Sequence, residues 1–109
     1  MSFKVEFKNY LDDLHKSLCE VSDWMYENPE LGFQEFKTSK HLVDYIQKNS
    51  KSVNYPSHGL ETAFDVTFGE DGPLVVICVE YDALPEIGHA CGHNIIATAS
   101  IGAGLGLKD

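Results

Sequence analysis

The run LVVICVEY, residues 74–81, constrains the fold more than any other stretch of the chain. It is rich in β-branched residues and nearly continuous in apolar character, a pattern typical of a strand buried on both faces. Such a strand needs partner strands beside it and covering layers above and below it. The run therefore predicts an α/β fold with a parallel or mixed sheet.

Two amphipathic helices are predicted before this run. Apolar residues recur in steps of three and four, at positions 7, 11, 14, 18, 21 and 25. This spacing indicates a helix with one buried face. Pro29 and Gly32 predict a turn after it. A second helix is predicted over residues 34–48, with its apolar face formed by Phe36, Val43 and Ile46.

Further elements flank the predicted central strand. TAFDVTF, residues 62–68, alternates in polarity and predicts a half-buried strand. IIATASIGAGLGL, residues 95–107, is apolar on all sides and predicts a buried helix. Its three glycines each weaken a helix by about 1 kcal/mol, so they predict the close approach of a neighbouring backbone. Cys19 and Cys78 are predicted to be core residues.

Composition limits the classes of partner. The 109 residues allow one domain at most, and the formal net charge of -9 argues against a nucleic-acid or anionic-membrane partner. The three cysteines are widely spaced and imply no disulfide framework, which favours a reducing, cytoplasmic location. No apolar stretch approaches the roughly 20 residues that span a bilayer.

Candidate site residues gather in EIGHACGHN, residues 86–94, where His89, Cys91 and His93 alternate along the chain. In an extended backbone, residues i and i+2 share a face about 6.6 Å apart, close enough for Cys91 and His93 to bind one ion. Thiolate and imidazole suit zinc, and imidazole with carboxylates also suits manganese. Asp82 follows the predicted buried strand, where it is expected to act as a ligand or to orient a histidine.

Two other interpretations of this stretch remain open. Cys91 is a candidate catalytic thiol with His93 or His89 as its base. Alternatively, the stretch is an ordinary turn that holds a buried cysteine beside histidines bonded to the backbone. The nearby GAGLG lacks the spacing of a phosphate-binding loop, so close helix packing explains it better.

The segments ENPELGFQEFKTS and VEYDALPEIGHACGHN, with the small-residue helix after them, resemble the metal-dependent amidohydrolases of the aminoacylase and carboxypeptidase type, the peptidase M-twenty family. The resemblance spans residues 11–107, and the nearest branch contains aminobenzoyl-glutamate hydrolases and aminoacylase-like dipeptidases. It implies the N-terminal part of an α/β/α sandwich metallopeptidase catalytic domain.

The resemblance also implies roles for individual residues. Cys91 and His93 match metal ligands of a two-metal zinc or manganese site, and Asp82 matches an active-site aspartate that helps to orient a ligand. The role of His89, the first residue of the motif, stays open. Many family members carry Asp after the second histidine of the motif; Asn94 stands there in this chain and is assigned no catalytic role.

The implied activity is hydrolysis of an amide or peptide bond in a dipeptide or an N-acyl amino acid. In the family, the general-base glutamate, the remaining metal ligands and the lid domain for dimerisation lie beyond the matched stretch. Residues 1–109 are therefore expected to form an incomplete, N-terminal portion of one catalytic domain. The alternative is a catalytically silent fragment or isoform that binds metal weakly or interacts with a partner.

Overall fold

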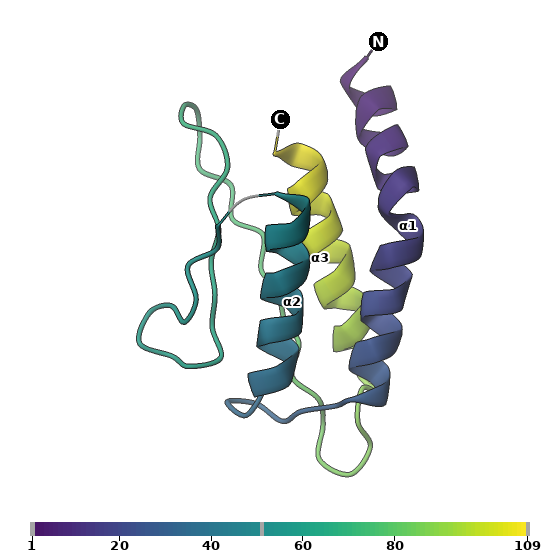
Figure 1. Cartoon of the computed structure of the whole chain (residues 1–109), viewed down its shortest axis with the longest axis vertical. Coiled ribbons are helices and arrows are strands. Elements are labelled where there is room, and N and C mark those ends of the chain that lie inside the picture. Colours follow the sequence, from purple (N-terminus) through teal and green to yellow (C-terminus); the bar gives the residue numbers. More distant parts are fainter. Residues whose placement is uncertain (1, 51, 109) are drawn as a thin grey trace.

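The computed structural model describes residues 2–50 and 52–108, which form three helices and a long irregular segment (Figure 1). The helices are α1 (Phe3–Glu27), α2 (Phe36–Asn49) and α3 (His93–Leu107). All three predicted helices are confirmed, although α1 and α3 begin earlier than predicted. Helix α1 runs antiparallel to the other two (Figure 1). Met1, Lys51 and Asp109 lie outside the described residues.

Local chemistry explains both ends of α1. The Ser2 hydroxyl accepts a hydrogen bond from the Val5 amide at 3.3 Å, which satisfies one of the amides at the start of the helix. At the other end, the Asn28 side chain donates to the Trp24 carbonyl at 2.8 Å. Pro29 follows directly, and its ring cannot continue a helix.

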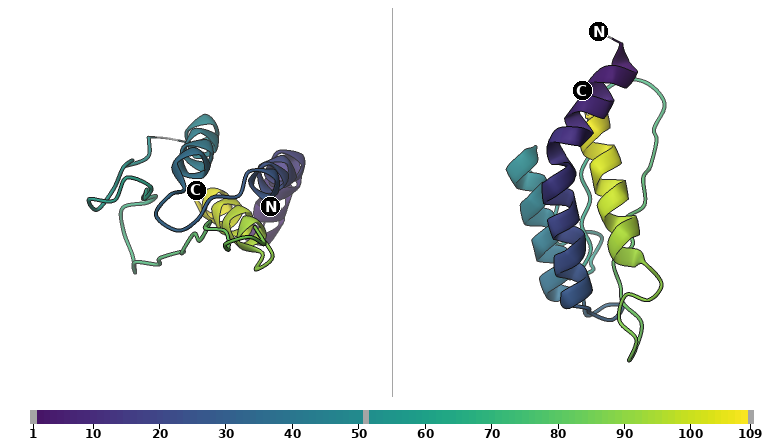
Figure 2. Two further views of the ribbon diagram at one scale, coloured as in Figure 1. Left: turned by 90° about the horizontal axis from the view of Figure 1, so that it is seen from below. Right: turned by 90° about the vertical axis from the view of Figure 1, so that its right-hand side faces the viewer.

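The core lies between the three helices and closes mainly where α1 packs on α3 (Figures 1 and 2). Apolar residues from all three helices join Tyr81 of the irregular segment in one cluster: Val21, Met25, Leu42, Ile46, Tyr81, Ala97, Ile101 and Leu105. The polarity alternation predicted for residues 62–68 is confirmed in its facing, because Phe64, Val66 and Phe68 pack against this cluster. Their backbone forms no strand, only a bridge between Asp65 and Asn54.

The predicted central strand is not formed in the part of the chain that the structure describes. Leu74, Val75 and Val76 are 84%, 77% and 73% exposed, and the described residues contain only isolated β-bridges. A strand buried on both faces exists only when neighbouring strands and layers cover it, and no described segment does so. The sheet of the predicted α/β/α sandwich is therefore not confirmed. The prediction that Cys19 and Cys78 are core residues is wrong, since both are exposed.

The glycines of α3 face α1, but through side chains rather than a closely approaching backbone. A Cβ atom at Gly106 would lie 2.5 Å from Phe7, and one at Gly102 would lie 3.1 Å from Leu18. Gly104 has no neighbour within 4 Å. The prediction that α3 is buried all round is wrong, because Ile95 is 65% exposed. A buried stripe along the helix, and not full burial, accounts for its small residues.

These contacts predict opposite results for two alanine substitutions. Gly104→Ala is expected to raise the free energy of unfolding by about 0.5–1 kcal/mol, because alanine favours the helix and its methyl group meets nothing. Gly106→Ala is expected to lose this gain, since the methyl group displaces the Phe7 ring. Urea denaturation of both variants measures the difference. Equal stabilisation by both would contradict the packing of Phe7 on Gly106.

Stability is also expected to fall in mild acid through His41 of α2. The His41 ring stacks on Trp24 of α1 with centroids 4.0 Å apart. Burial lowers the pKa of His41 from its ordinary 6.5, and Asp44 opposes this only in part. The unfolded chain therefore binds this proton more tightly, so stability present above pH 6.5 is lost as the pH falls below it. His41→Phe, which keeps a stacked ring, should flatten the pH dependence of the urea midpoint; an unchanged dependence would refute the assignment.

The three helices share one further property: within residues 2–50 and 52–108, none combines the length and the apolar character needed to cross a membrane.

Candidate functional site

The loop that carries the histidines lies at one end of the helices, where α1 ends and α2 and α3 begin (Figures 1 and 2). Two contacts fasten the loop to the α1–α2 connection. The Ala83 amide donates to the Glu30 carbonyl at 2.7 Å, and Gly88 lies against the Pro29 ring. Gly88 has a φ of 63° and a Cβ there would lie 3.7 Å from Pro29, so a side chain is disfavoured mainly by the backbone conformation.

Asp82 holds His93, the first residue of α3. The Nδ1 atom of His93 lies 2.9 Å from Oδ1 of Asp82 and 3.0 Å from the Asp82 carbonyl oxygen. A backbone carbonyl only accepts hydrogen bonds, so Nδ1 is the donor and carries the hydrogen. In the neutral ring, the lone pair is then on Nε2, the nitrogen that faces away from Asp82. The predicted partnership of Asp82 with a histidine is thus present in the structure.

Glu80 is a neighbour of this histidine that was not among the predicted site residues. Its Oε2 atom lies 3.8 Å from Nε2 of His93, on the side of the ring opposite Asp82. Its position two residues before Asp82 in VEYD was the only available signal, since side chains at i and i+2 of an extended backbone share a face. The carboxylate is exposed and adds a third polar group around the same imidazole.

Cys91 lies beside His93 in sequence but in a turn rather than an extended run. The Gly92 amide donates to the His89 carbonyl at 3.1 Å, and Gly92 has a φ of 84°. The predicted alternation of side chains on one face is therefore wrong for residues 89–92. The thiol of Cys91 is exposed to solvent. It remains available to a ligand or a reagent.

His89 differs from the other two, because it is only 5% exposed. Neither of its ring nitrogens has a hydrogen-bond partner among the described residues. Burial lowers the pKa of His89, proximity to His93 lowers it further, and Asp82 raises it in part. The alternative in which loop histidines bond to the backbone fails for His89. The structure therefore contains a buried neutral imidazole whose polar atoms are unsatisfied.

Relatives with named activities match the chain over most of its length. The chain is 33% identical over 108 residues to the Xaa-Arg dipeptidase of Mus musculus, in an alignment that covers 90% of the chain and 25% of that dipeptidase. It is 27% identical over 124 residues to a p-aminobenzoyl-glutamate hydrolase of Escherichia coli, covering 94% and 26%. The chain belongs to the peptidase M-twenty family of amidohydrolases.

A third relative extends this range of activities. The N-acetylcysteine deacetylase of Bacillus subtilis is 26% identical over 106 residues, covering 84% of the chain and 28% of the deacetylase. The chain spans about a quarter of the length of the curated relatives it matches. No model of a protein family matches the sequence.

Asn94, the position at which many amidohydrolases of this family carry Asp, supports the fold. Its side-chain amide donates to the Ser22 hydroxyl at 3.1 Å and lies 3.3 Å from the Ser22 carbonyl. It is buried, and these contacts connect the start of α3 to α1. This position explains how an asparagine serves there without a catalytic role.

The number of metal donors is small. Within residues 2–50 and 52–108, no three His, Cys, Asp or Glu side chains converge closely enough to hold a metal ion. A catalytic zinc site typically has three protein ligands and a water. Cys91 and His93 therefore supply part of such a site.

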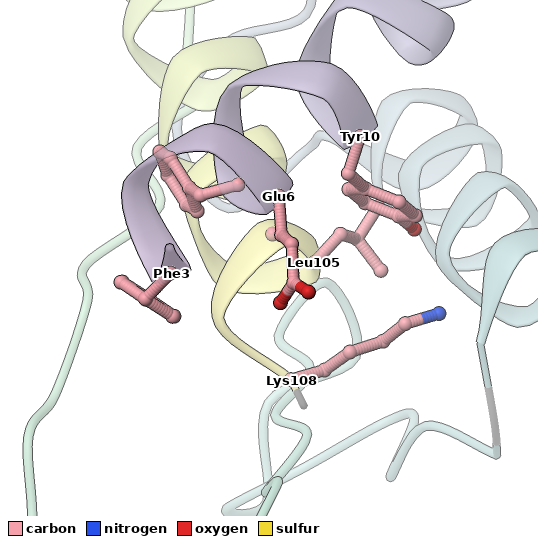
Figure 3. A pocket seen from close by; sticks show the side chains of 7 residues that line it. Phe3, Glu6, Tyr10, Leu105 and Lys108 are labelled. Atoms are coloured by element: carbon pink, nitrogen blue, oxygen red, sulfur yellow. The ribbon is translucent and has the colours of Figure 1, made fainter. Parts of the chain in front are cut away.

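A cavity of about 220 Å³ lies at the opposite end of the helices, between the start of α1 and the end of α3 (Figure 3). Phe3, Glu6, Tyr10, Leu105 and Lys108 line it, with the Lys108 ammonium 5.2 Å from the centre of the Tyr10 ring. Leu105 lies twelve residues beyond His93, about 18 Å along the helix. This cavity is therefore separate from the histidine loop.

Proposed function

We propose that Cys91 and His93 are ligands of a divalent cation, zinc or manganese, in an enzyme that hydrolyses an amide or peptide bond of a dipeptide or N-acyl amino acid. The orientation of His93 by Asp82 is the observation that carries this proposal. The names of the relatives support the substrate class, since they include a dipeptidase, a deacetylase and a hydrolase of p-aminobenzoyl-glutamate.

The donor chemistry fits a divalent cation. A metal-bound histidine generally donates its other ring N–H to a carboxylate or a carbonyl, and His93 donates to both groups of Asp82. The exposed Cys91 thiol is a soft donor that zinc accepts. The unsatisfied imidazole of His89 is a further nitrogen donor in the same loop. A reduced Cys91 is required, which supports a cytoplasmic location.

The residues of this chain have distinct tasks in the proposed site. Asp82 keeps the hydrogen on Nδ1 of His93 and fixes the direction of the ring, so the Nε2 lone pair is presented to the site. Gly92 begins α3 with a left-handed backbone conformation and thereby positions Cys91 and His93 on either side of a turn. A divalent cation bound there polarises a substrate carbonyl and acidifies water. Donors beyond Cys91 and His93 complete its coordination.

Metal binding is the first test. Titration of the chain with Co²⁺ should produce a thiolate-to-cobalt absorption band, and calorimetry with Zn²⁺ should give a saturable signal. Both should be lost in Cys91→Ser, and His93→Ala should weaken binding by at least about tenfold. Cys78→Ser is the matched control, because Cys78 is also exposed but lies outside the loop. Binding that survives both loop substitutions would refute the assignment.

Turnover is the second test and separates the enzyme from the silent alternative. The protein, as it is expressed in its own cells, should hydrolyse at least one member of a panel containing dipeptides, N-acetyl amino acids and aminobenzoyl-glutamate. His93→Ala should lower turnover at least about 100-fold, because a lost ligand disturbs the metal as well as its orientation. Metal binding without turnover of any panel member would instead favour the silent alternative.

A further inference from the structure

A second thiol and imidazole pair lies on α1, away from the loop of residues 82–93. His15 and Cys19 are one helical turn apart, and Nε2 of His15 lies 3.7 Å from Sγ of Cys19. Both side chains are exposed. The proposed hydrolase site uses neither residue, and the helical pattern alone placed Cys19 in the core.

The pair borders an open groove of about 600 Å³ between α1 and α3. The groove lies on the face of this helix pair where α3 exposes Ile95 and Ala99. Its walls are mainly apolar, with Leu11 and Leu18 from α1 opposite Ile95 and Ala103 from α3. Pockets for small molecules have this size and this combination of apolar walls with a few polar groups.

We propose that Cys19 is a modification site that captures small, neutral electrophiles with an apolar tail, such as α,β-unsaturated ketones. The thiol sulfur is a soft nucleophile, and the imidazole beside it is positioned to accept its proton. The apolar groove next to the sulfur would hold the tail. A neutral reagent is favoured because Asp12 lines the same groove and the chain carries a net charge of -9.

The reaction balances without any other reactant. The Cys19 proton moves to Nε2 of His15, and the sulfur forms a bond to the β-carbon of the enone as the carbon–carbon π bond breaks. The resulting enolate then takes the proton back from His15 at its α-carbon. The product is a thioether, and neither oxidation nor reduction occurs.

The chain supplies its own comparison, because all three cysteines are exposed. Cys78 lies in the extended segment after Pro73 and lines neither the groove nor the cavity at the helix ends. Its thiol therefore reports how an exposed cysteine reacts without a groove. Differences between Cys19 and Cys78 within one molecule are independent of reagent concentration and of exposure time.

The test measures adduct formation at each cysteine by peptide mass spectrometry, with methyl vinyl ketone as the short enone and oct-1-en-3-one as the tailed one. Cys19 should react several-fold faster than Cys78 with both reagents. The preference for the tailed enone over the short one should be about tenfold greater at Cys19 than at Cys78, as expected when a few methylene groups are buried.

Two variants separate the roles of the base and the groove. His15→Gln should slow both reagents several-fold at Cys19 and leave Cys78 unchanged. Ala99→Leu, at an exposed groove position, should remove the tail preference while the short enone reacts at its original rate. Circular dichroism checks that both variants keep their helices. Equal rates at Cys19 and Cys78, or a Cys19 rate insensitive to His15→Gln, would overturn the proposal.

Discussion

Replacing Leu42 with alanine is expected to lower the free energy of unfolding by about 3 kcal/mol. Leu42 is 0% exposed and lies in the cluster where α2 meets the other helices. Removal of its side chain loses the transfer free energy of the buried methyl groups and leaves a cavity that the helices fill only in part. Urea denaturation followed by circular dichroism measures the change.

Leu74→Ala is the matched control, since it removes the same atoms from a side chain that is 84% exposed. Its effect should stay within about 0.5 kcal/mol, the usual range for a surface substitution. A loss at Leu74 as large as that at Leu42 would show that residues 74–81 are buried, as the sequence alone predicts. The pair of variants thus tests the core and the exposed segment together.

Asp82→Ala is expected to weaken metal binding about 10–100-fold, the usual cost of losing a carboxylate that orients a ligating histidine. The substitution removes the side-chain oxygen that accepts from His93 and leaves the backbone carbonyl contact in place. The ring then loses part of the constraint that directs Nε2 into the site. Zinc calorimetry on the chain measures the affinity without requiring turnover.

Asp71→Ala removes the same charge from an exposed turn and is the control for this experiment. It should leave zinc affinity unchanged, because the turn lies outside the loop of residues 82–93. Equal weakening by both substitutions would mean that overall charge, and not the orientation of His93, sets the affinity. No weakening by Asp82→Ala would remove the main support for His93 as an oriented ligand.

The helices were predictable because their signals are local. The steps of three and four before Met25, the stop at Pro29 and the apolar run after Asn94 each depend on a few neighbouring residues. The structure shifts the starts of these helices but keeps all three. Facing was predictable for the same reason: Val43 and Ile46 are buried, whereas Phe36, at the start of the predicted face, is 50% exposed.

The central strand was not predictable, because pairing is a non-local property. The β-branched run at residues 74–81 has the composition of a buried strand, but composition does not supply a partner. In the described residues the run is extended and exposed, apart from its end at Tyr81. Cys78 follows the segment to the surface for this reason. The exposure of Cys19 has a different cause, since α3 covers only part of the face that α1 presents.

The site was predictable in its members and not in its geometry. The sequence by itself determined the three helices, the membership of the His–Cys–His loop and the resemblance to metal-dependent amidohydrolases. Only the tertiary structure decided that Asp82 faces His93, that His89 is buried and that His15 meets Cys19 beside a groove. The reason is physical: periodicity and turn chemistry act over a few residues, whereas a side chain's burial and its partners depend on segments that folding brings together.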